Sequence, residues 1–83
     1  DGEWVYVLDK GNRRVQRFNT RGEFSREWGS QGDDEGQFQA PSTIVIDDSG
    51  FIYVGDIESH RVQKFDDRGV LLKEWVTSGI DGG

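Results

Sequence analysis

The chain has 83 residues, of which 33% are hydrophobic and 12% aromatic, enough for a packed core. The absence of cysteine excludes disulfide staples and thiolate chemistry. No apolar run approaches the roughly 20 residues that a membrane-spanning helix needs. The net charge of -6 disfavours nucleic-acid partners, because Lys and Arg supply most of the affinity for phosphate backbones.

The basic residues concentrate near the N-terminus. Residues 1–28 hold six basic and five acidic side chains, whereas residues 29–83 hold four basic and eleven acidic ones. We interpret the N-terminal arginines as sheet-edge and loop cations that pair with nearby carboxylates, rather than as a nucleic-acid patch. These arginines are Arg13, Arg14, Arg17, Arg21 and Arg26, and the expected carboxylates are Glu23, Glu27 and Asp9.

Short apolar clusters, rich in β-branched and aromatic residues and broken by Gly, Asn and Asp, predict an all-β protein. No window carries the 3.6-residue stripe of an amphipathic helix. In chain order, we expect strands at about residues 3–8, 13–18, 23–28, 42–47, 51–56, 60–66 and 70–75.

The expected strands differ in their patterns. Trp4–Leu8, Ile44–Ile46 and Phe51–Val54 are apolar at successive positions, which predicts burial of both faces. Strands 23–28 and 70–75 alternate and carry charge, as sheet edges do. In the first of these edges, Phe24, Arg26 and Trp28 are expected on one side and Glu23, Ser25 and Glu27 on the other; Leu71, Lys73 and Trp75 repeat the first set.

Three segments predict tight turns between these strands. Asn19–Gly22, Asp66–Gly69 and Asp48–Gly50 each place glycine where a hairpin favours positive φ.

The segment Trp4–Trp28 recurs as Phe51–Trp75, 47 residues later and without a gap. Such a repeat indicates one supersecondary unit stacked on copies of itself. Four-stranded antiparallel units stacked face to face are β-propeller blades. The strongest repeated positions pair Asp9 with Asp56, Arg14 with Arg61, Phe18 with Phe65, Gly22 with Gly69 and Trp28 with Trp75.

The repeat predicts two consecutive antiparallel blades, the first with three strands and the second with four. The predicted divisions are an incomplete blade at 1–28, an inter-blade loop at 29–41, a complete blade at 42–76, and the start of a further connection at 77–83.

Pro41–Asp56, followed by His60–Phe65 and Gly69, resembles an NHL repeat, and Gly29–Pro41 is similar to the connection between blades in that family. The resemblance implies a propeller, usually of six blades, that binds protein, RNA or carbohydrate at its top surface or central channel. It favours an extracellular or periplasmic location. Related propellers include lyases and hydrolases with a metal ion near the axis.

Two blades leave two outer faces without a neighbour. Each face measures roughly 300 Å², from the spacing and rise of strands. Leaving a wholly apolar face in water forfeits on the order of 7 kcal/mol. We therefore expect further blades, either in the same chain or in other copies that form an oligomer or a filament.

Asp9 and Asp56 end equivalent strands before tight loops. A ring of such carboxylates near the propeller top would bind a cation, but a carboxylate that accepts backbone N–H bonds in its own turn is the favoured interpretation. The acidic segment Asp33–Glu35 lacks the alternating ligand spacing of a calcium loop and is interpreted as an inter-blade loop.

The remaining candidates also favour structural roles. His60 is the single histidine and aligns with Arg13, so neither a His-rich zinc site nor a catalytic triad is predicted. The tryptophans could stack on sugars or bases, but packing between blades is the favoured interpretation. Those tryptophans are Trp4, Trp28 and Trp75, and the serines outside any nucleophile motif are Ser25, Ser42 and Ser59.

These observations predict a non-catalytic propeller scaffold for protein–protein interaction or self-assembly, without cofactor or metal. The alternatives are a segment of a metal-dependent propeller enzyme and a subunit of a propeller-based fibre. RNA binding rests on family analogy alone.

Overall fold

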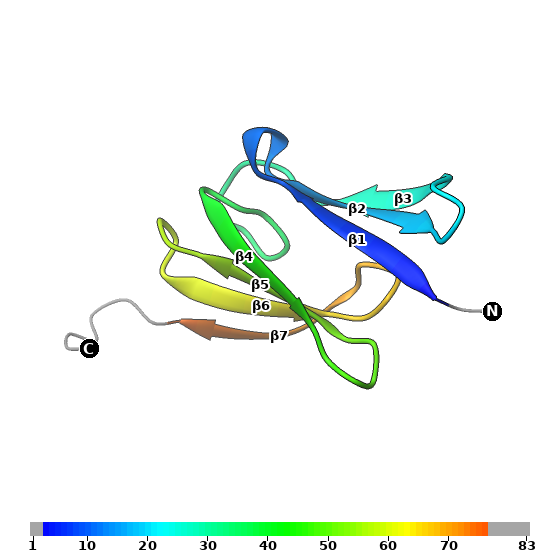
Figure 1. Cartoon of the computed structure of the whole chain (residues 1–83). Coiled ribbons are helices and arrows are strands. Elements are labelled where there is room, and N and C mark those ends of the chain that lie inside the picture. Colours follow the sequence, from blue (N-terminus) through cyan, green and yellow to red (C-terminus); the bar gives the residue numbers. More distant parts are fainter. Residues whose placement is uncertain (1–2, 77–83) are drawn as a thin grey trace.

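The computed structural model describes residues 3–76, which form two antiparallel sheets joined by one long connection (Figure 1). In each sheet the strands follow chain order. No helix within residues 3–76 has the length and apolar character to cross a membrane. The first sheet contains β1 (Trp4–Asp9), β2 (Arg14–Asn19) and β3 (Phe24–Trp28), with a 3-10 turn, η1 (Lys10–Asn12), after β1; the second contains β4 (Pro41–Ile46), β5 (Ile52–Asp56), β6 (Arg61–Phe65) and β7 (Leu71–Val76).

The fold class predicted from the sequence is confirmed: two antiparallel sheets, of three and four strands, arranged as propeller blades. Every strand begins and ends within one residue of its predicted bounds. The connection between the sheets runs across residues 29–40 and carries one isolated parallel bridge, from Gln31 to Phe38.

The three predicted turns share one construction. Gly22, Gly50 and Gly69 have φ values of 85°, 90° and 86°, the left-handed region that glycine enters without steric cost. Each turn begins with a side-chain oxygen that accepts two backbone N–H bonds, as in an Asx turn. These first residues are Asn19, Asp47 and Asp66.

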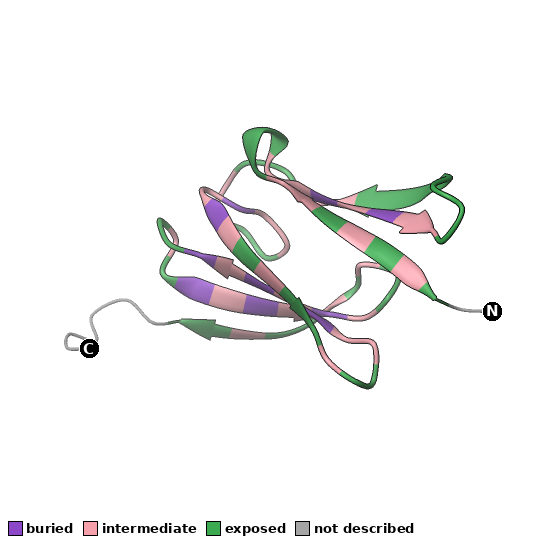
Figure 2. Cartoon of the chain, in the orientation of Figure 1, coloured by how far each residue is buried: buried purple, intermediate pink, exposed green. Residues whose placement is uncertain are grey.

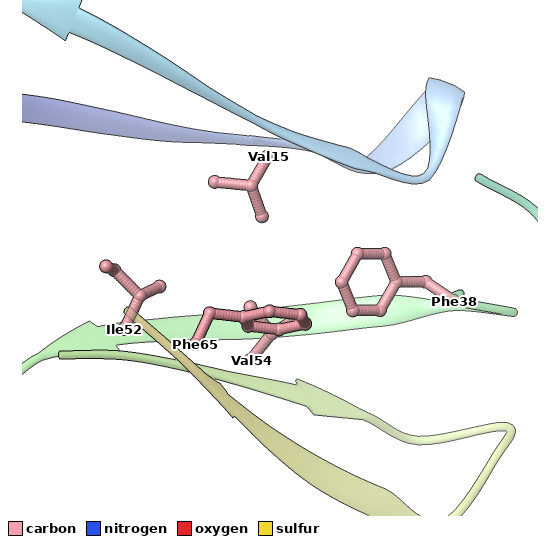
Figure 3. Packing of buried hydrophobic residues seen from close by; sticks show 5 residues of the cluster. All are labelled: Val15, Phe38, Ile52, Val54 and Phe65. Atoms are coloured by element: carbon pink, nitrogen blue, oxygen red, sulfur yellow. The ribbon is translucent and has the colours of Figure 1, made fainter. Parts of the chain in front are cut away.

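The hydrophobic core lies between the two sheets (Figure 3). Val15 points from β2 toward the second sheet, and Phe38 enters from the connection. The ring of Phe38 meets that of Phe65 edge-on, with 6.0 Å between centroids. The most buried apolar side chains are Val15, Phe38, Ile52, Val54 and Phe65.

The prediction that the inner strands are buried on both faces is wrong for β1 and β4. Side chains of β1 alternate between half-buried and exposed (Figure 2), and Val5 and Val7 are 48% and 42% exposed. On β4, Val45 is 53% exposed. Only one face of each sheet packs against the other sheet, so the successive apolar residues of these strands divide between the core and the solvent.

The predicted alternation of β3 is also wrong, because a β-bulge interrupts the pairing of β2 with β3. Arg17 pairs with Arg26, but Phe18 pairs with Phe24, so Ser25 is the additional residue. Phe24 therefore packs edge-on against Phe18, away from the core, while Ser25 accepts hydrogen bonds from Arg17. β6 and β7 show the same shift between Lys64 and Phe65.

Substitution of Gly69 tests the packing between the blades. Its φ is positive, and a Cβ placed there would lie 2.5 Å from the Trp28 ring. Gly22, its repeat equivalent, has nearly the same φ but open space around it. We expect Gly69→Ala to lower the free energy of unfolding by about 1–3 kcal/mol more than Gly22→Ala, because only the former adds a clash to the backbone strain. Urea unfolding of both variants measures the difference, and equal losses would contradict the packing.

Candidate functional site

We call the contact between the two sheets the seam. Part of it is formed by side chains of the first sheet that reach the turn Asp66–Gly69 of the second sheet. The guanidinium of Arg17 donates to the Asp67 carbonyl and lies 3.6 Å from the centre of the Trp4 ring. Arg26 donates to the Arg68 carbonyl at 3.2 Å. Two turn carbonyls of the second blade thus receive charged donors from the first blade.

Trp28 fills the space between these arginines and the core. Its ring lies 5.7 Å from that of Phe65 and 6.2 Å from that of Tyr6, measured between centroids. It also covers Gly69 so closely that no side chain fits there. The seam therefore requires an aromatic residue on one blade and a glycine on the other.

Arg61 and Gln63 on β6 hold the connection against the second blade. Arg61 is 5% exposed and donates to the carbonyls of Asp33, Asp34 and Gln37, at 2.9, 3.0 and 2.6 Å. The fully buried Gln63 amide donates to the Gln37 carbonyl and accepts from the Gly36 N–H. These bonds satisfy backbone groups that the connection would otherwise leave unpaired.

Asp56 fixes the end of the connection where β4 begins. Its carboxylate accepts from the backbone N–H groups of Gln39, Ala40 and Ser59, at 2.6, 3.0 and 3.0 Å, and also from that of Glu58. Burial raises the pKa of Asp56, but these backbone donors outweigh it and hold the pKa below its ordinary value. The carboxylate is therefore a structural acceptor that stays ionised at neutral pH.

Asp9, the repeat equivalent of Asp56, makes fewer bonds. It accepts from Asn12 and Arg14, both at 3.0 Å, and these hydrogen bonds lower its pKa. Arg14 also pairs with Glu27 at 3.1 Å. Asp9 and Asp56 thus lie at equivalent strand ends, but only Asp56 is enclosed by an inter-blade connection.

The other predicted site residues occupy loops. His60 and Arg13 are the two non-glycine residues of the described chain with positive φ, 56° and 54°, so the alignment identifies equivalent backbone positions. Asp33 accepts from the Gln39 amide at 3.1 Å. Within residues 3–76, no group of three or more His, Asp or Glu side chains has the arrangement to hold a metal ion.

Apolar side chains line the two outer faces of the pair of sheets. On the first sheet, Val5, Val7 and Phe24 are 48%, 42% and 56% exposed. On the second, Val45 is 53% exposed and Trp75, which stacks on Tyr53, is 39% exposed. We call these surfaces the first outer face, which contains Val5, Val7, Gln16, Phe18 and Phe24, and the second outer face, which contains Val45, Tyr53, Val62, Lys64, Lys73 and Trp75.

The second outer face contains an open, mainly apolar hollow of about 530 Å³. Val62 and His60 line it, together with Gly55. These three residues are the repeat equivalents of Val15, Arg13 and Leu8. In the first blade, Val15 and Phe38 belong to one buried cluster and Arg13 donates to the Gln39 carbonyl, so the hollow corresponds to the place that the connection fills one repeat earlier. The other lining residues include Thr43, Val45, Tyr53 and Ile57.

The repeated positions divide between the seam and the outer faces. Trp28, Phe65 and Gly69 meet at the seam, whereas Phe18 and Trp75 lie on the outer faces. Phe38 and Gln63 were not singled out from the sequence. Arg17 was expected to pair with a carboxylate, but it donates to the Ser25 hydroxyl and the Asp67 carbonyl. Gln63 had a detectable signal, because Arg-Val-Gln occurs in both copies. Phe38 had none from the repeat, since no equivalent position occurs among the 83 residues.

Two stacked antiparallel sheets, with the connection locked between them, define a pair of propeller blades. Residues 38–65 match the family model of the NHL repeat, which confirms the resemblance predicted from the sequence. The match spans the inner two strands and β6 of the second blade, including Phe38, Asp56 and Phe65. No curated protein matches the chain.

Removing the charge of Asp56 is expected to destabilise the protein by about 1–3 kcal/mol at pH 7, because buried N–H donors lose an acceptor. The pKa of Asp56 is lower in the folded than in the unfolded state. Its stabilising contribution is therefore present above the unfolded pKa, about 3.9, and is lost as the pH falls through the folded value. Urea titrations at pH 7 and pH 3 should show a smaller acid loss for Asp56→Asn than for the native chain.

Asp9→Asn is the matched control for this prediction, since it changes the equivalent carboxylate outside the seam. It should lower stability less than Asp56→Asn. An equal effect of the two substitutions would contradict the structural role assigned to Asp56.

Arg61→Lys tests whether the planar guanidinium group of Arg61 is needed to donate to three backbone carbonyls. Lysine keeps the charge but cannot reproduce the donor geometry, so we expect a loss of at least about 2 kcal/mol in the free energy of unfolding. Arg14→Lys is the control, because Arg14 is the repeat equivalent and its side chain is 32% exposed. Thermal and urea unfolding measure both variants; a loss for Arg61→Lys no larger than for Arg14→Lys would refute the role.

Proposed function

We propose that this protein is a non-catalytic β-propeller scaffold, whose outer blade faces bind further propeller blades. The exposure of large apolar side chains on both outer faces carries this proposal. Val7 and Phe24 on the first outer face, and Trp75 on the second, are at least 39% exposed. Scattered apolar residues are ordinary on a surface, but a whole sheet face of them marks an interaction site.

The chemistry of the two faces supports binding to protein rather than to a small charged ligand. On the second outer face, the Lys64 ammonium lies 4.4 Å from the centre of the Phe51 ring, and Lys73 lies 5.3 Å from that of Trp75. These lysines cover aromatic rings with their stems and leave donors at the rim. An apolar centre with a polar rim is the usual anatomy of a protein interface.

A tandem protein tests whether the outer faces bind blades. Two copies of the chain, joined through a second copy of Gln37–Asp47, keep the 47-residue period of the repeat throughout. The tether raises the effective concentration of the two faces to the millimolar range. We expect one cooperative thermal transition at a higher Tm than that of the single chain, because the two central faces become buried.

The tandem protein would contradict the proposal if its halves unfolded independently at the Tm of the single chain. A tandem carrying Val7→Lys in its second copy is the control. That substitution places a charge on the joined face and should return the Tm to that of the single chain.

A further inference from the structure

The two outer faces are repeat equivalents of the two halves of the seam. The first-blade side of the seam includes Tyr6, Val15 and Trp28, and residues 47 positions later form the second outer face. The second-blade side of the seam includes Val54 and Phe65, and residues 47 positions earlier form the first outer face. The seam pairs are Trp28 with Gly69, Arg17 with the Asp67 carbonyl, Arg26 with the Arg68 carbonyl, and Val15 with Phe65.

We propose that the second outer face of one molecule binds the first outer face of a second copy of this chain, in the register of the seam. This inference rests on the proposed function and names its partner. The register follows directly from the repeat: Trp75 covers Gly22, Lys64 and Lys73 donate to the carbonyls of Thr20 and Arg21, and Val62 packs against Phe18.

The residues at these positions suit the assigned contacts. Gly22 has open space around it and a φ of 85°, matching the site that Trp28 covers on Gly69. Lys64 and Lys73 replace Arg17 and Arg26, so a cation is retained at each position that donates to a turn carbonyl. Lys64 lies over the Phe51 ring as Arg17 lies over the Trp4 ring, so the second outer face already has the cation–ring arrangement of the seam.

Two differences make the contact between copies weaker than the seam. Gly55 stands where Leu8 contributes apolar area in the first blade, and within residues 3–76 no side chain fills the hollow beside it as Phe38 fills the place next to Val15. From strand spacing and rise, the two faces together bury roughly 600 Å². Stable protein–protein complexes bury about 1,200–2,000 Å² in total, so this contact is smaller. Association is therefore reversible and depends on concentration.

The contact is heterologous, because the two faces differ, and this permits a decisive test. Val7→Lys blocks only the first outer face, and Trp75→Lys blocks only the second. Both residues are substantially exposed, so the substitutions leave the core intact. Val62→Lys provides an independent block of the second face in case loss of the Trp75–Tyr53 stacking disturbs the fold. Circular dichroism confirms that each variant is folded.

Sedimentation velocity of each variant alone should give a monomer of 9.4 kDa, because each copy has one free face and no complementary one. An equimolar mixture of Val7→Lys with Trp75→Lys should form a one-to-one complex that grows no further. Glu35→Lys is the control, because Glu35 is exposed in the connection, which belongs to neither outer face. Glu35→Lys should associate like the native chain.

Dimers of either variant alone would overturn the inference in favour of an isologous contact. A mixture that stays monomeric at all concentrations would overturn it as well. If the tandem protein nevertheless gains stability, the faces bind blades only within one chain, and the proposed function stands without this partner. If the tandem gains nothing, both fail.

Discussion

A β-sheet with apolar residues on both faces must be covered on both, and this constraint organises the whole chain. In the described residues, one face of each sheet meets that constraint by packing on the other sheet around Phe38 and Phe65. The contact excludes water from five fully or nearly fully buried apolar side chains. The opposite faces carry the same kind of residues, with Val7 and Val45 exposed. The fold thus contains one satisfied interface and the two halves of another.

The second requirement is that the backbone polar groups of the connection find hydrogen-bond partners. A long irregular segment between two sheets leaves backbone groups that need partners, and Arg61, Gln63 and Asp56 supply them. All three come from β5 and β6 of the second blade. Their repeat equivalents in the first blade are Arg14, Gln16 and Asp9; Arg14 and Asp9 pair with neighbours on their own sheet. The same side chains therefore serve a connection where one is present and pair locally where none is described.

The sequence predicted the strands and turns well, because their signals are local. Gly22 and Gly69 mark turns that need positive φ, and the gapless repeat gives every strand except β4 twice. The bulge at Ser25 was not predicted, because no residue type distinguishes an inserted residue from a regular one in a short edge strand. The apolar runs at β1 and β4 predicted burial on both faces, which depends on neighbours that a local pattern cannot report.

The candidate site was predicted only in part. Among the repeated positions, Arg61 and Asp56 bond to the connection, and Trp28 packs between the blades. The pattern could not say that Trp28 is inside the seam while Trp75 lies on an outer face, because both copies carry the same residue. Phe38, which belongs to the core, has no repeat equivalent among the 83 residues, so the repeat carries no signal for it. Those distinctions depend on the order of blades in space rather than on residue type.

The solution mass of the native chain, measured by light scattering over a wide range of concentration, tests most directly whether the outer faces require partners. Our account predicts a mass that rises from 9.4 kDa toward multiples of it as concentration increases. A mass of 9.4 kDa at every concentration, together with a cooperative thermal transition, would show that two blades are stable with both outer faces in water and would contradict the account.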